Sequence, residues 1–436
     1  MTQAEGILVR GGRVIDPASG QNGRADVRIA GGRVIETATA LEPRPGERVI
    51  EAAGLLVTPG LVDLHVHLRE PGQTASETIA TGAAAATAGG FTTICAMPNT
   101  EPVIDTPERV RDVIERGRAA GAARVLPIGA ATRGSRGEAL TDIHALARAG
   151  AVAVSDDGLP VATGELLAEA LIVAREAGIV VADHCEDRRL SAGGAVHRDA
   201  AGPLNVGGVP PEAESKAVAR DLEVLSRTGG RLHVCHVSTA GSVELLRQAR
   251  RTGLAVTAEV SPHHLTLTHR AVADLGASGK MNPPLASEED REAVLEALLD
   301  GTIDCVATDH APHTEREKSR GLAAAPFGVI GVETAFPVLY TDLVRAGRMT
   351  LSDLVDRLTV APARVFGLEV GRLATGAPGD LAVFDLDLDW MVDPAAFRSL
   401  GRNTPWAGRR LMGRPVLTIA RGRVVHDLLS SVGGAG

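Results

Sequence analysis

The sequence lacks the features that mark a membrane-spanning, secreted or nucleic-acid-binding protein. No apolar run approaches the ~20 residues that a transmembrane helix needs. The N-terminus has no basic stretch followed by an apolar core, so no secretory signal is visible and a cytoplasmic location is expected. The net charge of −9 argues against a general nucleic-acid binder, although it is compatible with a local positive pocket for a small anion.

Cysteine and lysine are also scarce. The four cysteines are widely spaced and form no CxxC pair, so buried, reduced thiols are expected rather than disulfides. Lysine occurs only at Lys216, Lys280 and Lys318, and the other basic residues are arginines. Neither a GxSxG nor a GxxxxGK[ST] motif is present, which counts against a serine hydrolase and a P-loop protein.

Both ends of the chain show the same short β pattern. A turn followed by a strand is repeated as GRVI at 12–15, GRVI at 32–35 and GRVV at 422–425. At 436 residues, the chain is long enough for a large domain and a smaller one. We therefore expect residues 1–58 and 371–436 to form one small β-sandwich domain.

The central region, residues 59–370, alternates strand-like runs with helical stretches rich in Ala, Glu and Arg. The strand-like runs are 61–67, 91–97, 124–129, 151–155, 179–184, 231–236, 255–260 and 303–309. Eight such repeats predict an α/β fold of the closed (β/α)₈ TIM-barrel type rather than an open sheet. In a TIM barrel the chemistry takes place at the C-terminal ends of the strands.

The first of these runs carries two histidines on one face. Because side chains alternate along a strand, Asp63, His65 and His67 share a face. The opposite face, at 62, 64 and 66, is apolar and is expected to pack on helices. Two histidines so placed can both reach one Zn²⁺ ion, whereas the alternative is a pair of hydrogen-bonded core histidines.

Further metal-binding residue types end other predicted strands. His184, His236 and Asp309 each lie at the end of a strand-like run, and Asp156 and Asp157 follow another. Imidazole and carboxylate ligands with one position open to water are typical of a catalytic zinc site. Strand alternation does not decide between the two aspartates, because the chain is leaving the strand there.

The motifs resemble those of the dihydroorotases of the bacterial single-function type, within the amidohydrolase superfamily. They occur in the expected order from about 60 to 337, and they read GLVDLHVHLREPG, AMPNTEPV, SDDG, DHCED, CHVST, EVSPHHL, KMNPPL, GTIDCVATDHAPH and APFGVIGVETAFP. The resemblance implies one or two zinc ions, and its metal ligands are His65, His67, Asp157, His184, His236 and Asp309. It also places Asp157 where many relatives have a bridging lysine, which this chain lacks before Lys216.

Asp309 and Arg69 are the candidates for proton transfer and substrate binding. Asp309 can take a proton from the attacking water and pass it to the departing nitrogen. Arg69 follows the first strand, where a guanidinium would suit the carboxylate of dihydroorotate. The resemblance adds substrate contacts at His67, Asn99, Asn282, His313, Phe327 and Gly328. A turn-forming role is the alternative for Asn99, which lies next to a proline.

The predicted activity is the reversible, zinc-dependent cyclisation of N-carbamoyl-L-aspartate to (S)-dihydroorotate, a step of pyrimidine synthesis. The alternatives are another cyclic amidohydrolase, such as an allantoinase or a dihydropyrimidinase, and a non-catalytic scaffold for aspartate carbamoyltransferase. Two protein partners stay open: a second copy of the chain in a homodimer, and aspartate carbamoyltransferase. Residues 313–327 are the candidate for a loop that closes over substrate.

Overall fold

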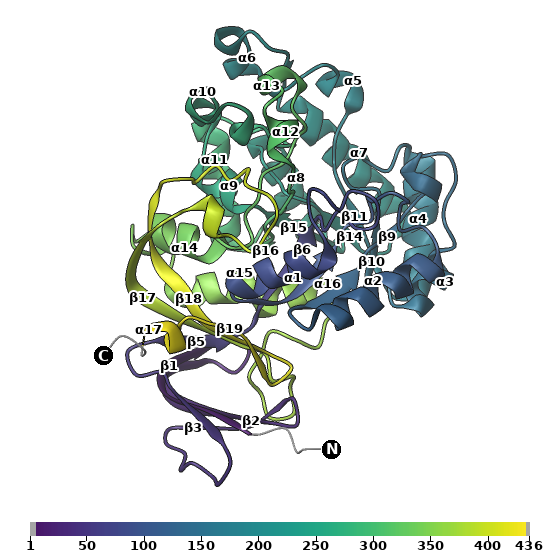
Figure 1. The fold of residues 1–436 in the computed structure, drawn as a ribbon. Helices are drawn as coiled ribbons and strands as arrows, with labels where there is room; N and C mark the ends of the chain where they lie inside the picture. Colours follow the sequence, from purple (N-terminus) through teal and green to yellow (C-terminus); the bar gives the residue numbers. More distant parts are fainter. Residues whose placement is uncertain (1–5, 433–436) are drawn as a thin grey trace.

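The computed structural model describes residues 6–432, and its central part is a closed barrel of parallel strands (Figure 1). The barrel strands are β6 (Leu61–Val66), β7 (Phe91–Ala96), β8 (Arg124–Pro127), β9 (Gly129–Ala130), β10 (Ala153–Ser155), β11 (Val180–Asp183), β14 (Leu232–Val234), β15 (Val256–Val260) and β16 (Cys305–Val306). They pair in the order β6-β7-β8 and β9-β10-β11-β14-β15-β16. The expected third strand is therefore split into β8 and β9 at Ile128.

Hydrogen bonds after β16 close the barrel by returning to β6. The Thr308 N–H and hydroxyl donate to the two carboxylate oxygens of Asp63, at 3.0 and 2.6 Å. The His67 N–H then donates to the His310 carbonyl at 2.8 Å. These bonds connect the first strand to the segment after the last one, so the strand ends form a ring.

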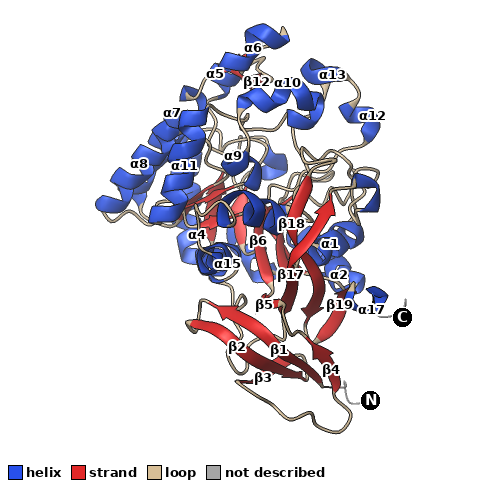
Figure 2. Cartoon of the chain, turned by 90° about the vertical axis from the view of Figure 1, so that its left-hand side faces the viewer, coloured by secondary structure: helices blue, strands red, loops and turns tan. Residues whose placement is uncertain are grey.

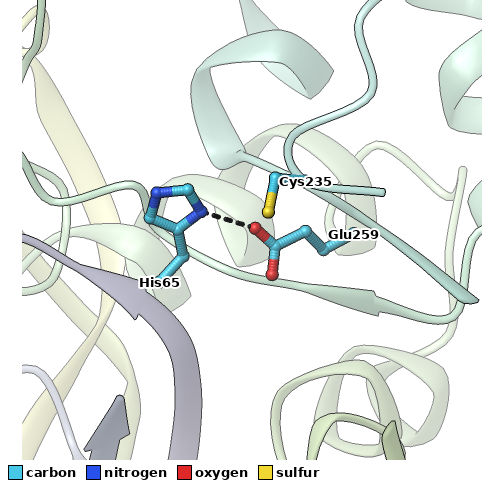
Figure 3. Close-up of side chains that lie close together, drawn as sticks. All are labelled: His65, Cys235 and Glu259. Atoms are coloured by element: carbon cyan, nitrogen blue, oxygen red, sulfur yellow. Dashed lines mark hydrogen bonds and ion pairs between the residues drawn. The ribbon is translucent and has the colours of Figure 1, made fainter. Parts of the chain in front are cut away.

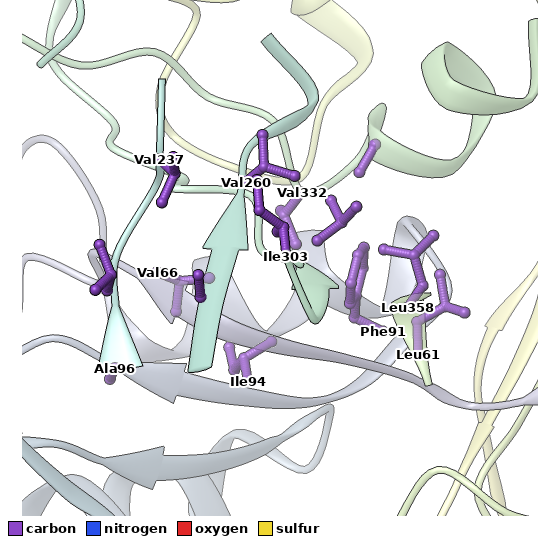
Figure 4. Packing of buried hydrophobic residues seen from close by; sticks show 14 of the residues in the cluster. Leu61, Val66, Phe91, Ile94, Ala96, Val237, Val260, Ile303, Val332 and Leu358 are labelled. Atoms are coloured by element: carbon purple, nitrogen blue, oxygen red, sulfur yellow. The ribbon is translucent and has the colours of Figure 1, made fainter. Parts of the chain in front are cut away.

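Helices surround the barrel and separate its strands from solvent (Figure 2). The larger ones are α1 (Ile79–Ala88), α2 (Pro107–Ala120), α3 (Ile143–Ala149), α4 (Gly164–Ala177), α7 (Glu212–Thr228), α8 (Ala240–Arg251), α11 (Glu288–Asp300), α15 (Leu351–Leu358) and α16 (Val360–Phe366). Several begin at a Thr or Ser cap whose side chain accepts a backbone N–H, as Thr163 does for α4. Each helix presents an apolar face to the strands, and Figure 4 shows part of the resulting core around Phe91 and Leu358.

Short helices lie in the loops at the end of the barrel that is distant from β1–β3 (Figures 1 and 2). They are α5 (Arg188–Ser191), α6 (Arg198–Leu204), α9 (Pro262–Thr266), α10 (Val272–Leu275), α12 (Glu315–Lys318) and α13 (Gly321–Ala324), with α14 (Ala335–Leu339) following on the side of the barrel. A two-stranded ribbon, β12 (Val196–His197) and β13 (Gly208–Val209), belongs to the same loops. These loops follow the C-terminal ends of the strands and surround the candidate site.

The two ends of the chain share one sheet beside the barrel, and Figure 1 shows the first and last segments side by side. Its strands are β1 (Ile7–Asp16), β2 (Gln21–Ala30), β3 (Arg33–Ala38), β4 (Arg48–Glu51), β5 (Leu56–Pro59), β17 (Leu381–Met391), β18 (Arg410–Ala420) and β19 (Arg423–Asp427). The order is β19-β18-β17-β5-β1-β2-β3, with β4 paired to β1, and α17 (Leu429–Val432) follows β19. Residues such as Val27 and Leu417, from both ends, pack in one core. The predicted β-sandwich from both termini is thus observed.

The apolar face of β6 packs against helices in part, as predicted. Val66 lies in the core shared with the surrounding helices, whereas Val62 and Leu64 lie in a separate buried cluster that combines Cys95 and Cys235 of neighbouring strands with residues of α16. Strict alternation fails because the pairing of β6 with β7 shifts register between Asp63 and Val66. Among residues 6–432, none of the helices combines the length and the apolar character that a bilayer-spanning helix requires.

Candidate metal centre and active site

His65, at the end of β6, has one ring nitrogen held and the other left free. Its Nδ1 lies 2.7 Å from Oε1 of Glu259 on β15, and Figure 3 shows this contact beside Cys235. A carboxylate can only accept, so Nδ1 carries the proton and Nε2 presents a lone pair. That Nε2 is buried without a hydrogen-bond partner and lies 3.3 Å from Oδ2 of Asp157.

His67 repeats the arrangement with an amide in place of the carboxylate. Its Nδ1 lies 2.8 Å from Oδ1 of Asn99, and its Nε2 lies 3.1 Å from Oδ1 of Asp309. Nδ1 is therefore the donor, and the Nε2 lone pair faces carboxylate oxygens. Two lone pairs directed at carboxylates repel them unless a cation lies between, so the chemistry of this donor set fits a metal ion.

Asp157 occupies the centre of the cluster and faces a different histidine pair with each oxygen. Oδ2 lies 3.3 and 3.4 Å from Nε2 of His65 and of His67. Oδ1 lies 3.6 Å from Nδ1 of His184 and 3.5 Å from Nε2 of His236. The six residues that the sequence predicted as metal ligands therefore lie in one cluster. Asp156 points elsewhere, because its carboxylate accepts the N–H and hydroxyl of Thr132, at 3.0 and 2.5 Å.

The electric field of the cluster favours positive charge. Burial opposes protonation of His65, but Asp157 and Asp309 raise its pKa well above the usual value. Burial likewise opposes ionisation of Asp157 and of Asp309, yet the pKa of each is lowered, with His65 as the main favourable neighbour. Both carboxylates are thus ionised at neutral pH, and the field that attracts a proton to the imidazoles also attracts a divalent cation.

A cavity of about 170 Å³ opens onto this cluster. Its wall contains every residue that was predicted to contact substrate, namely His67, Arg69, Asn99, Asn282, His313, Phe327 and Gly328. The volume is below the range of drug-sized pockets, so it suits a single small ring.

Arg69 is buried in this wall and is held in a fixed position. Its Nε donates to the Pro312 carbonyl at 3.1 Å, and its Nη2 lies 3.3 Å from Nε2 of His313. Burial lowers the pKa of Arg69 to about 10, so the side chain stays cationic at neutral pH. Burial, and then Arg69, lower the pKa of His313 to about 3, so that imidazole is neutral. The cavity therefore offers one fixed guanidinium to an anionic group.

Backbone strain is concentrated at the same place. Arg69, His236 and Asp309 have φ values of 59°, 34° and 48°, a region that side chains other than glycine rarely adopt. Gly328 has φ 123°, and a Cβ there would lie 2.7 Å from Cβ of Ala311. Such strain is typical of functional sites, where the surrounding structure holds the residue in position.

Several supporting residues were not predicted from the sequence. Glu259 orients His65, and Oε2 of Glu186 lies 3.3 Å from Nε2 of His184. Carboxylates that hold the distal nitrogen of a ligand histidine are common around metals. Asp63 accepts the N–H groups of His65 and Thr308. A carboxylate two positions beyond a strand histidine, as in DHCED, was the available signal for Glu186.

Three further histidines and one cysteine lie near the site. His264 and His310 make hydrogen bonds, to Ser261 and to Glu77 among others. His263 does not, since both of its ring nitrogens are buried without a partner. Cys185 faces away from the cluster, with its thiol 3.1 Å from Asp221.

Known proteins resemble this chain over nearly its full length. A dihydroorotase from Anaeromyxobacter dehalogenans is 53% identical over 427 residues, which cover 97% of this chain and 98% of that protein. The chain belongs to the dihydroorotase family. A second dihydroorotase, from Pelotomaculum thermopropionicum, is 50% identical over 96% of this chain and 98% of that protein. The sequence model of the family described as Dihydro-orotase-like matches residues 54–242.

Solved structures with the same architecture support this placement. An L-hydantoinase (dihydropyrimidinase) from Arthrobacter aurescens superimposes with a TM-score of 0.86 at 29% identity, over 97% of this chain and 96% of that one. The predicted TIM barrel and the predicted dihydroorotase family are both confirmed. The chain is an enzyme of the family, a metal-dependent hydrolase that acts on a cyclic amide.

Proposed function

We propose that the protein interconverts N-carbamoyl-L-aspartate and (S)-dihydroorotate with two zinc ions at the cluster around Asp157. One observation carries the proposal. The two oxygens of the Asp157 carboxylate face different histidine pairs, and a buried arginine lines the same small cavity. His65, His67, His184, His236 and Asp309 would hold the zinc together with Asp157, whose two oxygens face different histidine pairs. Imidazole and carboxylate donors suit zinc.

When bound, zinc acidifies water and polarises the scissile carbonyl. Asp309 is ionised and faces His67, so in ring opening it accepts a proton from the attacking water. It then delivers that proton to the departing ring nitrogen, and ring closure reverses both transfers. Burial of the cluster keeps bulk solvent from competing for this proton.

Substrate selection is assigned to the wall of the cavity that contains Arg69. The Arg69 guanidinium would bind the ring carboxylate, which hydantoin, dihydropyrimidine and allantoin rings lack. His67, Asn99, Asn282, His313 and the Phe327–Gly328 backbone would bind the rest of the ring. This cation favours dihydroorotate over the substrates of an allantoinase or a dihydropyrimidinase. All six predicted ligand positions carry residues that can bind a metal, which argues against a non-catalytic scaffold.

A paired assay tests the proposal. The purified protein, with its metal content measured by elemental analysis, is assayed with dihydroorotate and with an uncharged hydantoin. We expect turnover of dihydroorotate alone and two zinc ions per chain. The variant Asp309→Asn should lose almost all turnover. The control variant is Asp156→Asn, which changes an aspartate outside the metal-binding cluster and should keep its metal. Ring opening of the hydantoin without activity on dihydroorotate would refute the assignment.

The proposal also includes the domain limits and the partners. We propose a catalytic domain of residues 59–370 and a β-sandwich domain of residues 1–58 and 371–436, since β5 ends at Pro59 and β17 begins at Leu381. A homodimer and an association with aspartate carbamoyltransferase are tested by light scattering on the chain alone and after mixing with the transferase.

Closure over substrate is assigned to residues 313–327. This segment contributes His313 and Phe327 to the cavity wall. The buried Lys318 ammonium holds its end, with donations to the carbonyls of Pro326 and Gly328 at 3.1 and 2.8 Å.

A further inference from the structure

A second and larger cavity, of about 660 Å³, lies beside the metal-binding cluster. It is lined by residues 135–137, 159–160, 162–164 and 186–189, which follow β9, β10 and β11, and by the side of α7 around Lys216. It has no lining residue in common with the cavity that contains Arg69. Its volume falls in the range of small-molecule sites.

The wall of this cavity is positive, although the chain as a whole carries a net charge of −9. Its cationic side chains outnumber the acidic ones, Glu186 and Asp187, and they are Arg136, Arg188, Arg189, Lys216 and Arg220. A cleft lined by one sign of charge concentrates ions of the opposite sign. In an acidic protein, such clustering indicates an anion site.

Two of these cations have no carboxylate to neutralise them. Arg220 is paired with Asp221 at 2.6 Å, and Arg189 is paired with Asp187 at 3.1 Å. Among the side chains that the structure describes, Arg188 and Lys216 form no ion pair. The Glu186 carboxylate contacts His184 and Asn282 instead of either cation. Arg188 and Lys216 therefore offer charge-assisted donors from two different elements, the start of α5 and the side of α7.

The cavity is joined to the metal centre by two short segments. One runs from Asp157 at the cluster to Leu159 in the cavity wall, and the other from His184 to Glu186. Leu159 is anchored by donation of its N–H to the Asp156 carbonyl at 3.0 Å. A molecule that contacts Leu159 or Glu186 is therefore only two residues along the chain from Asp157 or His184, which are proposed metal ligands.

We propose that this cavity binds a small polyanion, a compound that carries at least two phosphate or carboxylate groups. Two free cations on separate elements suit two anionic groups, and the volume accommodates a molecule up to the size of a nucleotide. The occupant is either a phosphorylated metabolite or the dicarboxylate N-carbamoyl-L-aspartate, held before it reaches Arg69. The second source rests on the proposed function, whereas the first does not.

Calorimetric titration of the zinc-loaded enzyme with pyrophosphate, at near-physiological ionic strength, tests the site. The variant Arg188→Gln/Lys216→Gln should bind pyrophosphate at least about tenfold more weakly, since it loses two charge-assisted contacts. The control Arg227→Gln/Arg251→Gln removes the same charge from exposed helix positions and should bind as the wild type does. Metal content is measured afterwards, so that removal of zinc by pyrophosphate is detected.

Two outcomes would overturn the proposal: no binding by the wild type, or equal binding by the cavity variant. The source of the anion is identified with the Arg69→Met variant, in which the active site no longer binds carboxylates through Arg69. Displacement of pyrophosphate by N-carbamoyl-L-aspartate would identify the substrate, and displacement only by a nucleoside triphosphate would identify a phosphorylated ligand. Displacement by neither would also count against the site.

Discussion

The protonation of single imidazoles decides what the cluster can bind. Glu259 fixes the proton of His65 on Nδ1 and Asn99 does the same for His67, so both Nε2 lone pairs face Asp157 and Asp309. The tautomer is thus imposed by neighbours that lie far away in the chain. A metal ion is the partner that satisfies lone pairs and carboxylates together.

Removal of the guanidinium should separate substrate binding from metal binding. In Arg69→Met the zinc content should stay unchanged, because Arg69 contacts Pro312 and His313 rather than a proposed ligand pair. Loss of a buried charge pair with the substrate should lower kcat/KM by about 100- to 1,000-fold, mainly through KM. Steady-state kinetics and elemental analysis measure both quantities, with the exposed Arg118→Met as control. Loss of zinc in Arg69→Met would instead assign Arg69 a structural role.

Glu259 is expected to act through His65. In Glu259→Gln the amide still accepts from Nδ1, but the negative charge that makes Nε2 a stronger donor is lost. Zinc affinity should fall by about 10- to 100-fold. Competition with a chromophoric chelator measures it, and the exposed Glu244→Gln on α8 is the matched control. An unchanged zinc affinity with lower thermal stability would mean that Glu259 only supports packing.

At the scale of elements, the strands could be predicted, but their pairing could not. The alternation of apolar runs with helical stretches located the barrel strands to within a few residues. It did not show that one run is divided into β8 and β9, or that β6 has a register shift and places Val62 and Leu64 in a different buried cluster from Val66. Both features depend on neighbouring strands, whose contacts are not encoded in local periodicity.

The closure of the barrel depends on one carboxylate. Asp63→Ala would leave the Thr308 N–H and hydroxyl and the His65 N–H without their acceptor in a buried location. The free energy of unfolding should fall by about 2–4 kcal/mol. Denaturant titration measures it, with Asp112→Ala on the exposed face of α2 as control. A change below ~0.5 kcal/mol would show that the strand ends stay joined without Asp63.

At the scale of the whole molecule, the metal centre draws its proposed ligands from five strand ends. Chelation should therefore abolish turnover, and it should also lower the stability of the entire barrel. The loss is about 4 kcal/mol when free zinc had been 1,000-fold above its Kd. Differential scanning calorimetry before chelation, after it and after zinc is restored checks this expectation. If the unfolding temperature were the same with and without zinc, a metal centre that links the barrel strands would be excluded.

Glu333 connects the barrel to the C-terminal segment and should make stability depend on pH. Its carboxylate accepts the N–H groups of Arg398 and Ser399, and burial raises its pKa to about 7. Because the folded state holds this proton more tightly than the unfolded state does, stability is lost as the pH rises from about 4.5 to 7. Some exposure to solvent reduces the effect.

Glu333→Gln should therefore gain stability relative to the wild type by about 1–2 kcal/mol between pH 5 and pH 8. Denaturant titrations at both pH values give the difference, and Glu369→Gln at the surface is the control. A difference that is constant with pH, or that changes in the opposite direction, would contradict the assignment of the titrating group.

The sequence by itself determined the family, the barrel and the residue types at the ends of its strands. These follow from local patterns: a period of two along strands, strand–helix alternation, and histidines and aspartates in recognisable motifs. Only the tertiary structure decided that Asp157 rather than Asp156 faces the histidines, that Glu259 and Glu186 hold their distal nitrogens, and that cations from α5 and α7 face a second cavity. Each of these depends on distances between residues that the chain order keeps apart, and such distances exist only once the barrel has closed.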